Sequence, residues 1–110
     1  NALWPGKAMR GRSYETSKGA LVMFTKAMAA DWAVHGITVN AIAPGPFMTE
    51  ANRCWIGEKP DFEKEVAESV PLGRWGRPEA IGPLALYLAS EARSYMTGSV
   101  LVLDGGKLLW

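Results

Sequence analysis

Tyr14 and Lys18 are the two side chains of this sequence whose types and spacing best suit proton chemistry. Residues four apart in a helix share one face, so the phenol and the ammonium would be neighbours, with Ser17 beside them. A free phenol ionises near pH 10 and is a poor acid or base at pH 7. A positive charge about 5 Å away favours the phenolate and so helps a phenol to exchange a proton with an alcohol oxygen. The opposing interpretation is an amphipathic tyrosine and lysine at a surface.

A second candidate is the segment from Asn40 to Thr49. The apolar, β-branched residues 37–43 predict a buried parallel strand, which Pro44 and Gly45 end with a sharp turn. Ligands of open parallel α/β sheets bind at the carboxyl edge of the strands. The backbone amides that this turn exposes are therefore candidate ligand donors.

A long helix over residues 13–35 must carry Tyr14 and Lys18. Gly36 follows it as a left-handed stop. Two apolar stripes predict that the helix is covered on two sides, by a sheet and by another helix. The stripes are Leu21, Phe24, Met28 and Trp32, and Met23, Ala27, Ala30 and Val34.

The rest of the pattern predicts an α/β fold. Residues 44–77 form a long loop rich in Pro and Gly, of a length typical of binding loops, with one helix over 61–70. A helix over 79–90 starts at Pro78 and bends at Pro83, and a second buried strand covers 99–103. Two strands with three to four helices are too few to bury both faces of a parallel sheet. Residues 1–110 are therefore predicted to be the C-terminal part of one doubly wound, Rossmann-like domain whose N-terminal dinucleotide-binding half is absent.

Composition excludes several classes of function. The 110 residues carry a net charge of +1, which argues against nucleic acid as a default partner, and no apolar run is long enough for a membrane span. One Cys and one His exclude a Cys-rich or multi-His metal site, and we expect no metal. Cys54 is predicted to be non-catalytic, and its single thiol fits a cytoplasmic protein. The chain begins with Asn1, which suggests an excerpt.

Several motifs together resemble the short-chain dehydrogenase/reductase family, and more loosely its gluconate 5-dehydrogenase-like branch. They match in order across nearly the whole chain: Tyr14-x-x-Ser17-Lys18-Gly19-Ala20, Val39–Gly45, Thr49, Pro71–Arg74, Pro78-Glu79 and Asp104-Gly105-Gly106.

The resemblance implies an NAD(P)-dependent oxidoreductase that transfers hydride between NAD or NADP and a secondary alcohol or ketone, sugar-derived compounds among them. Tyr14 would be the acid/base, and Lys18 would lower its pKa and bind the nicotinamide ribose. Pro44, Gly45 and the Phe47 backbone would line the nicotinamide, and Thr49 would bind its carboxamide or phosphate side. Residues 48–70 would be a mobile substrate loop. The helices from Ser13 and Pro78, with strand 99–103, would form the contacts of a dimer or tetramer.

The sequence also departs from the family pattern. No Gly-x-x-x-Gly-x-Gly loop precedes Tyr14, and Asn1 stands where the family's catalytic Ser is expected, so either the Ser is replaced or the sequence begins just after it. The isolated chain is therefore expected to be inactive without an upstream half. Two alternatives stay open: a non-catalytic remnant that acts only as an association module, and an epimerase or dehydratase that uses the same Tyr/Lys pair.

Overall fold

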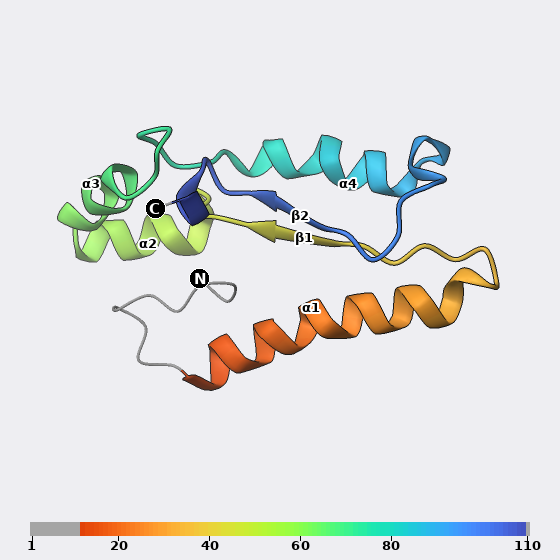
Figure 1. Cartoon of the computed structure of the whole chain (residues 1–110). Coiled ribbons are helices and arrows are strands. Elements are labelled where there is room, and N and C mark those ends of the chain that lie inside the picture. The colour runs from red at the N-terminus through yellow and green to blue at the C-terminus, as the bar shows by residue number, and fades with distance from the viewer. Residues whose placement is uncertain (1–11, 110) are drawn as a thin grey trace. The chain divides into compact units, whose positions relative to one another are not determined.

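A computed structural model describes residues 12–109 and contains four α-helices and two strands within that range (Figure 1). The elements are α1 (Arg12–Ala33), β1 (Ala41–Pro44), α2 (Glu50–Glu58), α3 (Asp61–Glu68), α4 (Ile81–Ala89) and β2 (Val100–Leu103). Short 3-10 turns cover Pro78–Ala80, Glu91–Arg93 and Lys107–Leu109. The predicted fold class, with two strands and three to four helices, is confirmed. Asn1 lies outside the described residues.

Internal contacts divide the chain into two compact units. The first holds the described residues up to Ala41 together with Arg93–Leu101. The second holds Ile42–Ala92 together with the described residues from Val102 onward. The boundary falls within β1 and within β2, so each strand contributes residues to both units.

The two strands pair in parallel as a two-stranded sheet. In the first unit the Ala41 N–H donates to the Ser99 carbonyl at 2.9 Å. In the second unit the Gly45 N–H donates to the Leu103 carbonyl at 2.9 Å. Immediately before Ala41, a side chain replaces part of the backbone hydrogen bonding between the two segments. Asn40 Nδ2 donates to the Met96 carbonyl, and Asn40 Oδ1 accepts from the Ser99 N–H. This mixed pattern explains why the strand is shorter than the predicted run 37–43.

The buried face of α1 differs from the two predicted stripes. Thr25 and Ala29 are its buried residues, and a Cβ placed on Gly98 would lie 3.4 Å from that of Ala29. The backbone at Gly98 can approach α1 closely because Ala29 is small. The Thr25 hydroxyl is satisfied within the helix, since it donates to the Leu21 carbonyl. Within residues 12–109 the predicted cover on two sides is not found, since Phe24 is 59% exposed and Trp32 43%. The predicted stop is confirmed, with Gly36 at φ 71°.

Helix α2 corrects the prediction of an irregular loop before residue 61. Thr49 begins the helix in extended conformation, and its side chain accepts a hydrogen bond from the Asn52 N–H at 3.3 Å. A threonine followed by an acidic residue is a usual helix start, so the signal was present in the sequence. Helices α2 and α3 contact each other directly (Figure 1).

The core of the second unit joins three segments of the chain. Val70, Phe47 and Trp75 are buried there. The Trp75 indole N–H donates to the Glu63 carbonyl at 3.0 Å, and its ring meets Phe62 edge to face at 5.9 Å. These contacts hold α3 against Trp75, in the segment that follows the helix.

Helix α4 starts two residues later than predicted. Pro78–Ala80 form a 3-10 turn, and the regular helix begins at Ile81, so that Pro83 falls in its first turn. Proline is tolerated there because the first N–H groups of a helix have no intrahelical partner.

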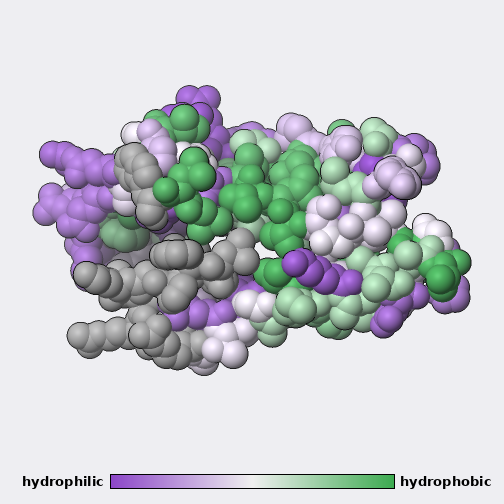
Figure 2. Space-filling model, viewed as in Figure 1, coloured by the Kyte–Doolittle hydropathy of each residue, from purple (hydrophilic) through white to green (hydrophobic). Residues whose placement is uncertain are grey.

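The surface of the described residues is partly hydrophobic. Figure 2 shows strongly hydrophobic residues gathered over the two strands. Even so, none of the helices within residues 12–109 combines the length and the apolar character needed to cross a membrane.

Candidate active site

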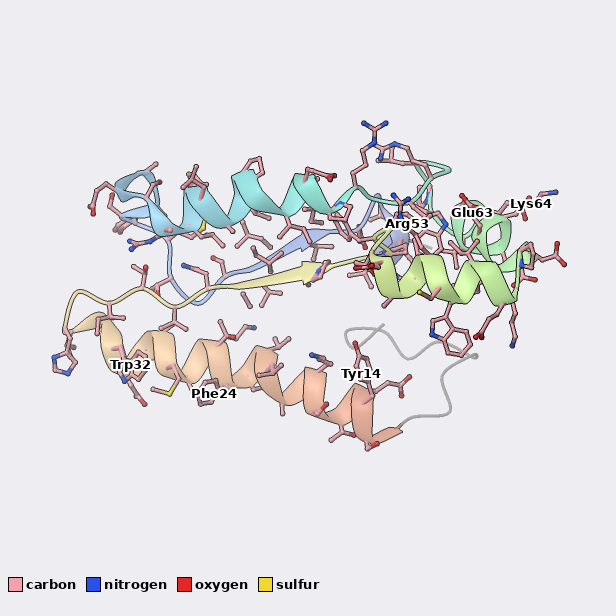
Figure 3. All side chains as sticks on the ribbon, turned by 180° about the vertical axis from the view of Figure 1, so that it is seen from behind. Tyr14, Phe24, Trp32, Arg53, Glu63 and Lys64 are labelled. Carbon is pink, nitrogen blue, oxygen red and sulfur yellow. The ribbon has the colours of Figure 1, made fainter. Side chains whose placement is uncertain are left out.

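Tyr14 and Lys18 meet on one face at the start of α1. Lys18 Nζ lies 5.5 Å from the centroid of the Tyr14 ring. Tyr14 is 50% exposed, and Figure 3 shows its side chain projecting from the helix. The Ser17 hydroxyl donates to the Tyr14 carbonyl at 2.8 Å and is thus engaged by the helix backbone. The phenol is therefore accessible and has a cation beside it.

The face that carries this pair is also the packed face of α1. Tyr14, Lys18, Thr25 and Ala29 follow one another at intervals of four, seven and four residues, which keeps them on one side of a helix. Thr25 and Ala29 are buried, whereas Tyr14 and Lys18 lie beyond the packed part. No hydrogen bond within residues 12–109 involves the phenol oxygen or Lys18 Nζ, so both groups can bind a ligand.

Pro44 and Gly45 lie at the carboxyl end of β1, in the second unit. The Gly45 N–H is already bonded to Leu103, and a Cβ on Gly45 would lie 2.6 Å from the Cα and Cβ of Asp104. Close packing against Asp104 is therefore the local reason for a glycine here. Pro44 is exposed and offers no N–H.

Phe47 combines a buried side chain with a backbone N–H that donates no hydrogen bond within residues 12–109. The residue is 6% exposed, and its ring lies against Gly76, where a Cβ would come within 2.8 Å of it. The Phe47 carbonyl accepts from the Thr49 N–H and from Asn52 Nδ2. Within the described part of the chain its N–H has no acceptor. Among residues 44–49 it is the one backbone N–H without an acceptor in the described part of the chain. Pro44 and Pro46 have no N–H, and the N–H groups of Gly45, Met48 and Thr49 all donate to backbone carbonyls.

Thr49 is the N-terminal cap of α2, a role that the sequence analysis did not predict for this residue. Its hydroxyl oxygen accepts from Asn52, so the hydroxyl hydrogen is left to donate elsewhere. Thr49 is exposed. Capping and ligand binding are thus compatible at this side chain.

A groove of about 950 Å³ opens beside these residues within the second unit. Its lining includes Pro46–Met48, the segment 74–80 and the end of β2. Three arginines line it, and sequence reasoning did not assign them a role: Arg53, Arg74 and Arg77. They are distant in the sequence, and only the tertiary fold brings them to one groove. Among the residues that the structure describes, no cluster of His, Cys, Asp or Glu could hold a metal ion.

The fold is that of an α/β protein, and its helix α1 carries a tyrosine with a lysine beside it. The sequence model described as "Enoyl-(Acyl carrier protein) reductase" matches residues 4–107. The chain belongs to this family of short-chain dehydrogenases/reductases, as the sequence motifs predicted.

Curated relatives share the similarity over most of this chain. Galactitol 2-dehydrogenase (L-tagatose-forming) from Cereibacter sphaeroides is 45% identical over 98 residues, which cover 89% of this chain and 38% of the relative. Gluconate 5-dehydrogenase from Gluconobacter oxydans is 40% identical over 93 residues, with 84% and 36% covered. The finer resemblance to gluconate 5-dehydrogenases is thereby confirmed. The chain spans well under half the length of either relative.

Solved structures agree with these relatives. A short chain dehydrogenase family protein from Francisella tularensis matches with a TM-score of 0.88 at 29% identity, covering 99% of this chain and 48% of that one. The NADP active-site complex of RhlG from Pseudomonas aeruginosa matches with a TM-score of 0.84 at 38% identity, covering 96% and 42%. The fold of this chain therefore corresponds to about half of a short-chain dehydrogenase.

Proposed function

We propose that this chain forms the catalytic and nicotinamide-side part of an NAD(P)-dependent oxidoreductase that acts on secondary alcohols and ketones. The observation that carries the proposal is the accessible Tyr14 phenol with Lys18 Nζ 5.5 Å from its ring. Family membership supports it, because every dehydrogenase named above belongs to the group that this chain matches.

Tyr14 is the proposed acid and base. In alcohol oxidation the phenolate takes the hydroxyl proton while the carbinol carbon gives up its hydride, and in ketone reduction the phenol returns the proton to the oxygen. The nicotinamide, when bound, accepts or supplies that hydride. The Lys18 ammonium stabilises the phenolate form by its charge and donates to ribose hydroxyls.

The described residues offer suitable groups for the nicotinamide side of the cofactor. The Phe47 N–H has no acceptor within residues 12–109 and is proposed to donate to the carboxamide oxygen. The remaining hydroxyl hydrogen of Thr49 is proposed as a second donor, and Pro44 and Gly45 as apolar lining. We propose NAD or NADP as the cofactor, supported by the NADP complex of RhlG.

Residues 1–110 are proposed to be the C-terminal portion of a single Rossmann-like domain. The relatives named above are more than twice as long as the matched segment, which supports this division. The phosphate-binding half would then lie on another part of the polypeptide, and the isolated chain would be inactive. Galactitol and gluconate, named for two relatives, support sugar-derived substrates. A reducing cytoplasm suits the exposed, free Cys54.

A homo-oligomer is proposed from the exposed apolar side of α1. Leu21 and Phe24 are more than half exposed, and Trp32 is 43% exposed, on a helix of 22 residues. Large exposed apolar surfaces on soluble domains mark interaction sites. The same surface favours the second candidate function, a non-catalytic association module.

Replacing Tyr14 by Phe in the intact protein tests the enzymatic proposal. We expect kcat to fall by roughly 10²- to 10⁴-fold, because the phenyl ring cannot transfer a proton. Cofactor affinity, measured by NADH fluorescence titration, should be nearly unchanged. Turnover that survives in this variant would overturn the assigned role.

Lys18→Met gives a distinguishing comparison. Loss of the ammonium should lower kcat and also weaken NADH binding, because Lys18 is proposed to act on both the phenol and the ribose. Ser17→Ala is the matched control, since the Ser17 hydroxyl bonds only the helix backbone. An intact protein with neither turnover nor NADH binding before mutation would favour the association module.

A further inference from the structure

The groove of the second unit is lined by three arginines and two carboxylates, and the proposed hydride transfer does not use the arginines. Arg53 comes from α2, whereas Arg74 and Arg77 come from the segment before α4. All three residues are exposed, so their guanidinium groups are accessible to a ligand. Figure 3 shows Arg53 rising from α2 toward the segment that precedes α4.

Within residues 12–109 the two carboxylates of the groove form no ion pair with these arginines, and the lining keeps a net positive charge. Asp104 is engaged by the turn after β2, because its two carboxylate oxygens accept from the N–H groups of Gly106 at 2.8 Å and Leu108 at 2.9 Å. Glu79 is the second carboxylate of the lining. Within residues 12–109 neither the Arg53 nor the Arg77 side chain makes a hydrogen bond or an ion pair. The Arg74 side chain uses one N–H, on the Trp75 carbonyl at 3.2 Å.

The arginines stand around a rigid apolar base. Phe47 and Trp75 are buried beneath the groove, and Gly76 pairs with residues 46–48 through two backbone hydrogen bonds of 2.9 Å. The Leu72 N–H donates to the Gly105 carbonyl and so joins the end of β2 to the same base. A preorganised base beside two guanidinium groups without a partner in residues 12–109, and a third that uses one N–H, suits an anion, because guanidinium binds carboxylate with paired, charge-assisted hydrogen bonds.

We propose that Arg53, Arg74 and Arg77 form a carboxylate-binding subsite. A groove of about 950 Å³ has the size of a small-molecule site. Phe47 belongs to the lining and also carries the N–H proposed to donate to the nicotinamide, so the subsite and that donor belong to the same unit. The inference rests on the proposed function in this respect: the anion is the carboxylate end of a hydroxy- or keto-acid substrate.

Gluconate and glucitol provide a matched pair of probes. Both have six carbons, but gluconate carries a carboxylate at the end where glucitol carries a hydroxymethyl group. We expect the intact protein to bind gluconate more tightly than glucitol in calorimetric titrations. Arg53→Gln and Arg77→Gln should each weaken gluconate binding roughly ten- to hundredfold and leave glucitol binding within about twofold, as loss of a charge-assisted hydrogen bond requires.

Lys26→Gln is the control for lost charge, because Lys26 is an exposed cation of α1 in the other unit. Equal affinities for the two probes would overturn the subsite, and so would an equal loss of gluconate affinity in the Lys26→Gln variant. Turnover of glucitol with no preference for gluconate would remove the subsite and leave the proposed function standing. Turnover that survives Tyr14→Phe, with selective gluconate binding unchanged, would overturn the proposed function and leave the carboxylate subsite standing.

Discussion

Phe47 combines an observed role in packing with a proposed role in binding. Its ring fills the core beside Gly76, and its carbonyl holds the start of α2 through Thr49 and Asn52. Its N–H has no acceptor in the described part of the chain and is the proposed donor to the nicotinamide. Since side-chain packing fixes the ring, the direction of the N–H is fixed as well. The proposed nicotinamide contact thus depends on the core beneath it.

Gly45→Ala is expected to destabilise the protein by about 1–3 kcal/mol. Its Cβ would come within 2.6 Å of the Asp104 backbone, which cannot yield without disturbing the Gly45–Leu103 hydrogen bond. Urea denaturation of the intact protein measures the change.

Gly57→Ala is the matched control for this substitution. Gly57 lies in α2, and a Cβ there would meet nothing within 4 Å, so alanine should stabilise the helix by about 0.5–1 kcal/mol. Equal effects of the two substitutions would show that close approach to Asp104 is not what requires glycine at position 45.

Helices α2 and α3 replace what the sequence predicted as one long loop with a single helix. The prediction missed α2 because its nine residues have little apolar periodicity, and no residue of α2 is buried. Helix α3 was predicted over 61–70 and is found over Asp61–Glu68. Its attachment through Trp75 joins residues twelve apart, and no local pattern reveals such a contact.

Trp75→Phe tests how α3 is held. Phenylalanine keeps an aromatic ring against Phe62 but removes the indole N–H that donates to the Glu63 carbonyl. We expect a loss of about 1 kcal/mol, seen as faster amide exchange in α3 than in the unaltered protein. Trp55→Phe is the control, because Trp55 is 55% exposed and its indole N–H has no acceptor within residues 12–109. Equal acceleration in both variants would contradict the role given to Trp75.

For the whole molecule, the exposed apolar side of α1 is the feature that needs an explanation. Burial of two apolar stripes was predicted, and the structure shows the packing of α1 within its unit at Thr25 and Ala29 instead. The stripes themselves are what the proposed second copy would cover. A helix exposed in one chain can in this way be buried in an assembly.

Phe24→Ser should weaken self-association of the intact protein, with the dissociation constant raised roughly tenfold or more. Phe24 is exposed in the chain, so the fold itself should lose little stability. Sedimentation velocity over a range of concentrations measures the change, with Tyr95→Ser as a control that also removes an exposed aromatic residue. An unchanged sedimentation profile for Phe24→Ser would exclude this side of α1 as the interface.

The sequence by itself determined the helix that carries Tyr14 and Lys18, the order of the strands and of the helices other than α2, and the family, because these follow from local spacing and short motifs. Tertiary structure alone decided which face of α1 is buried, which N–H of residues 44–49 has no acceptor among the described residues, and that Arg53, Arg74 and Arg77 share one groove. The physical reason is that burial, hydrogen-bond satisfaction and charge clustering depend on residues distant in the chain, to which local periodicity is insensitive.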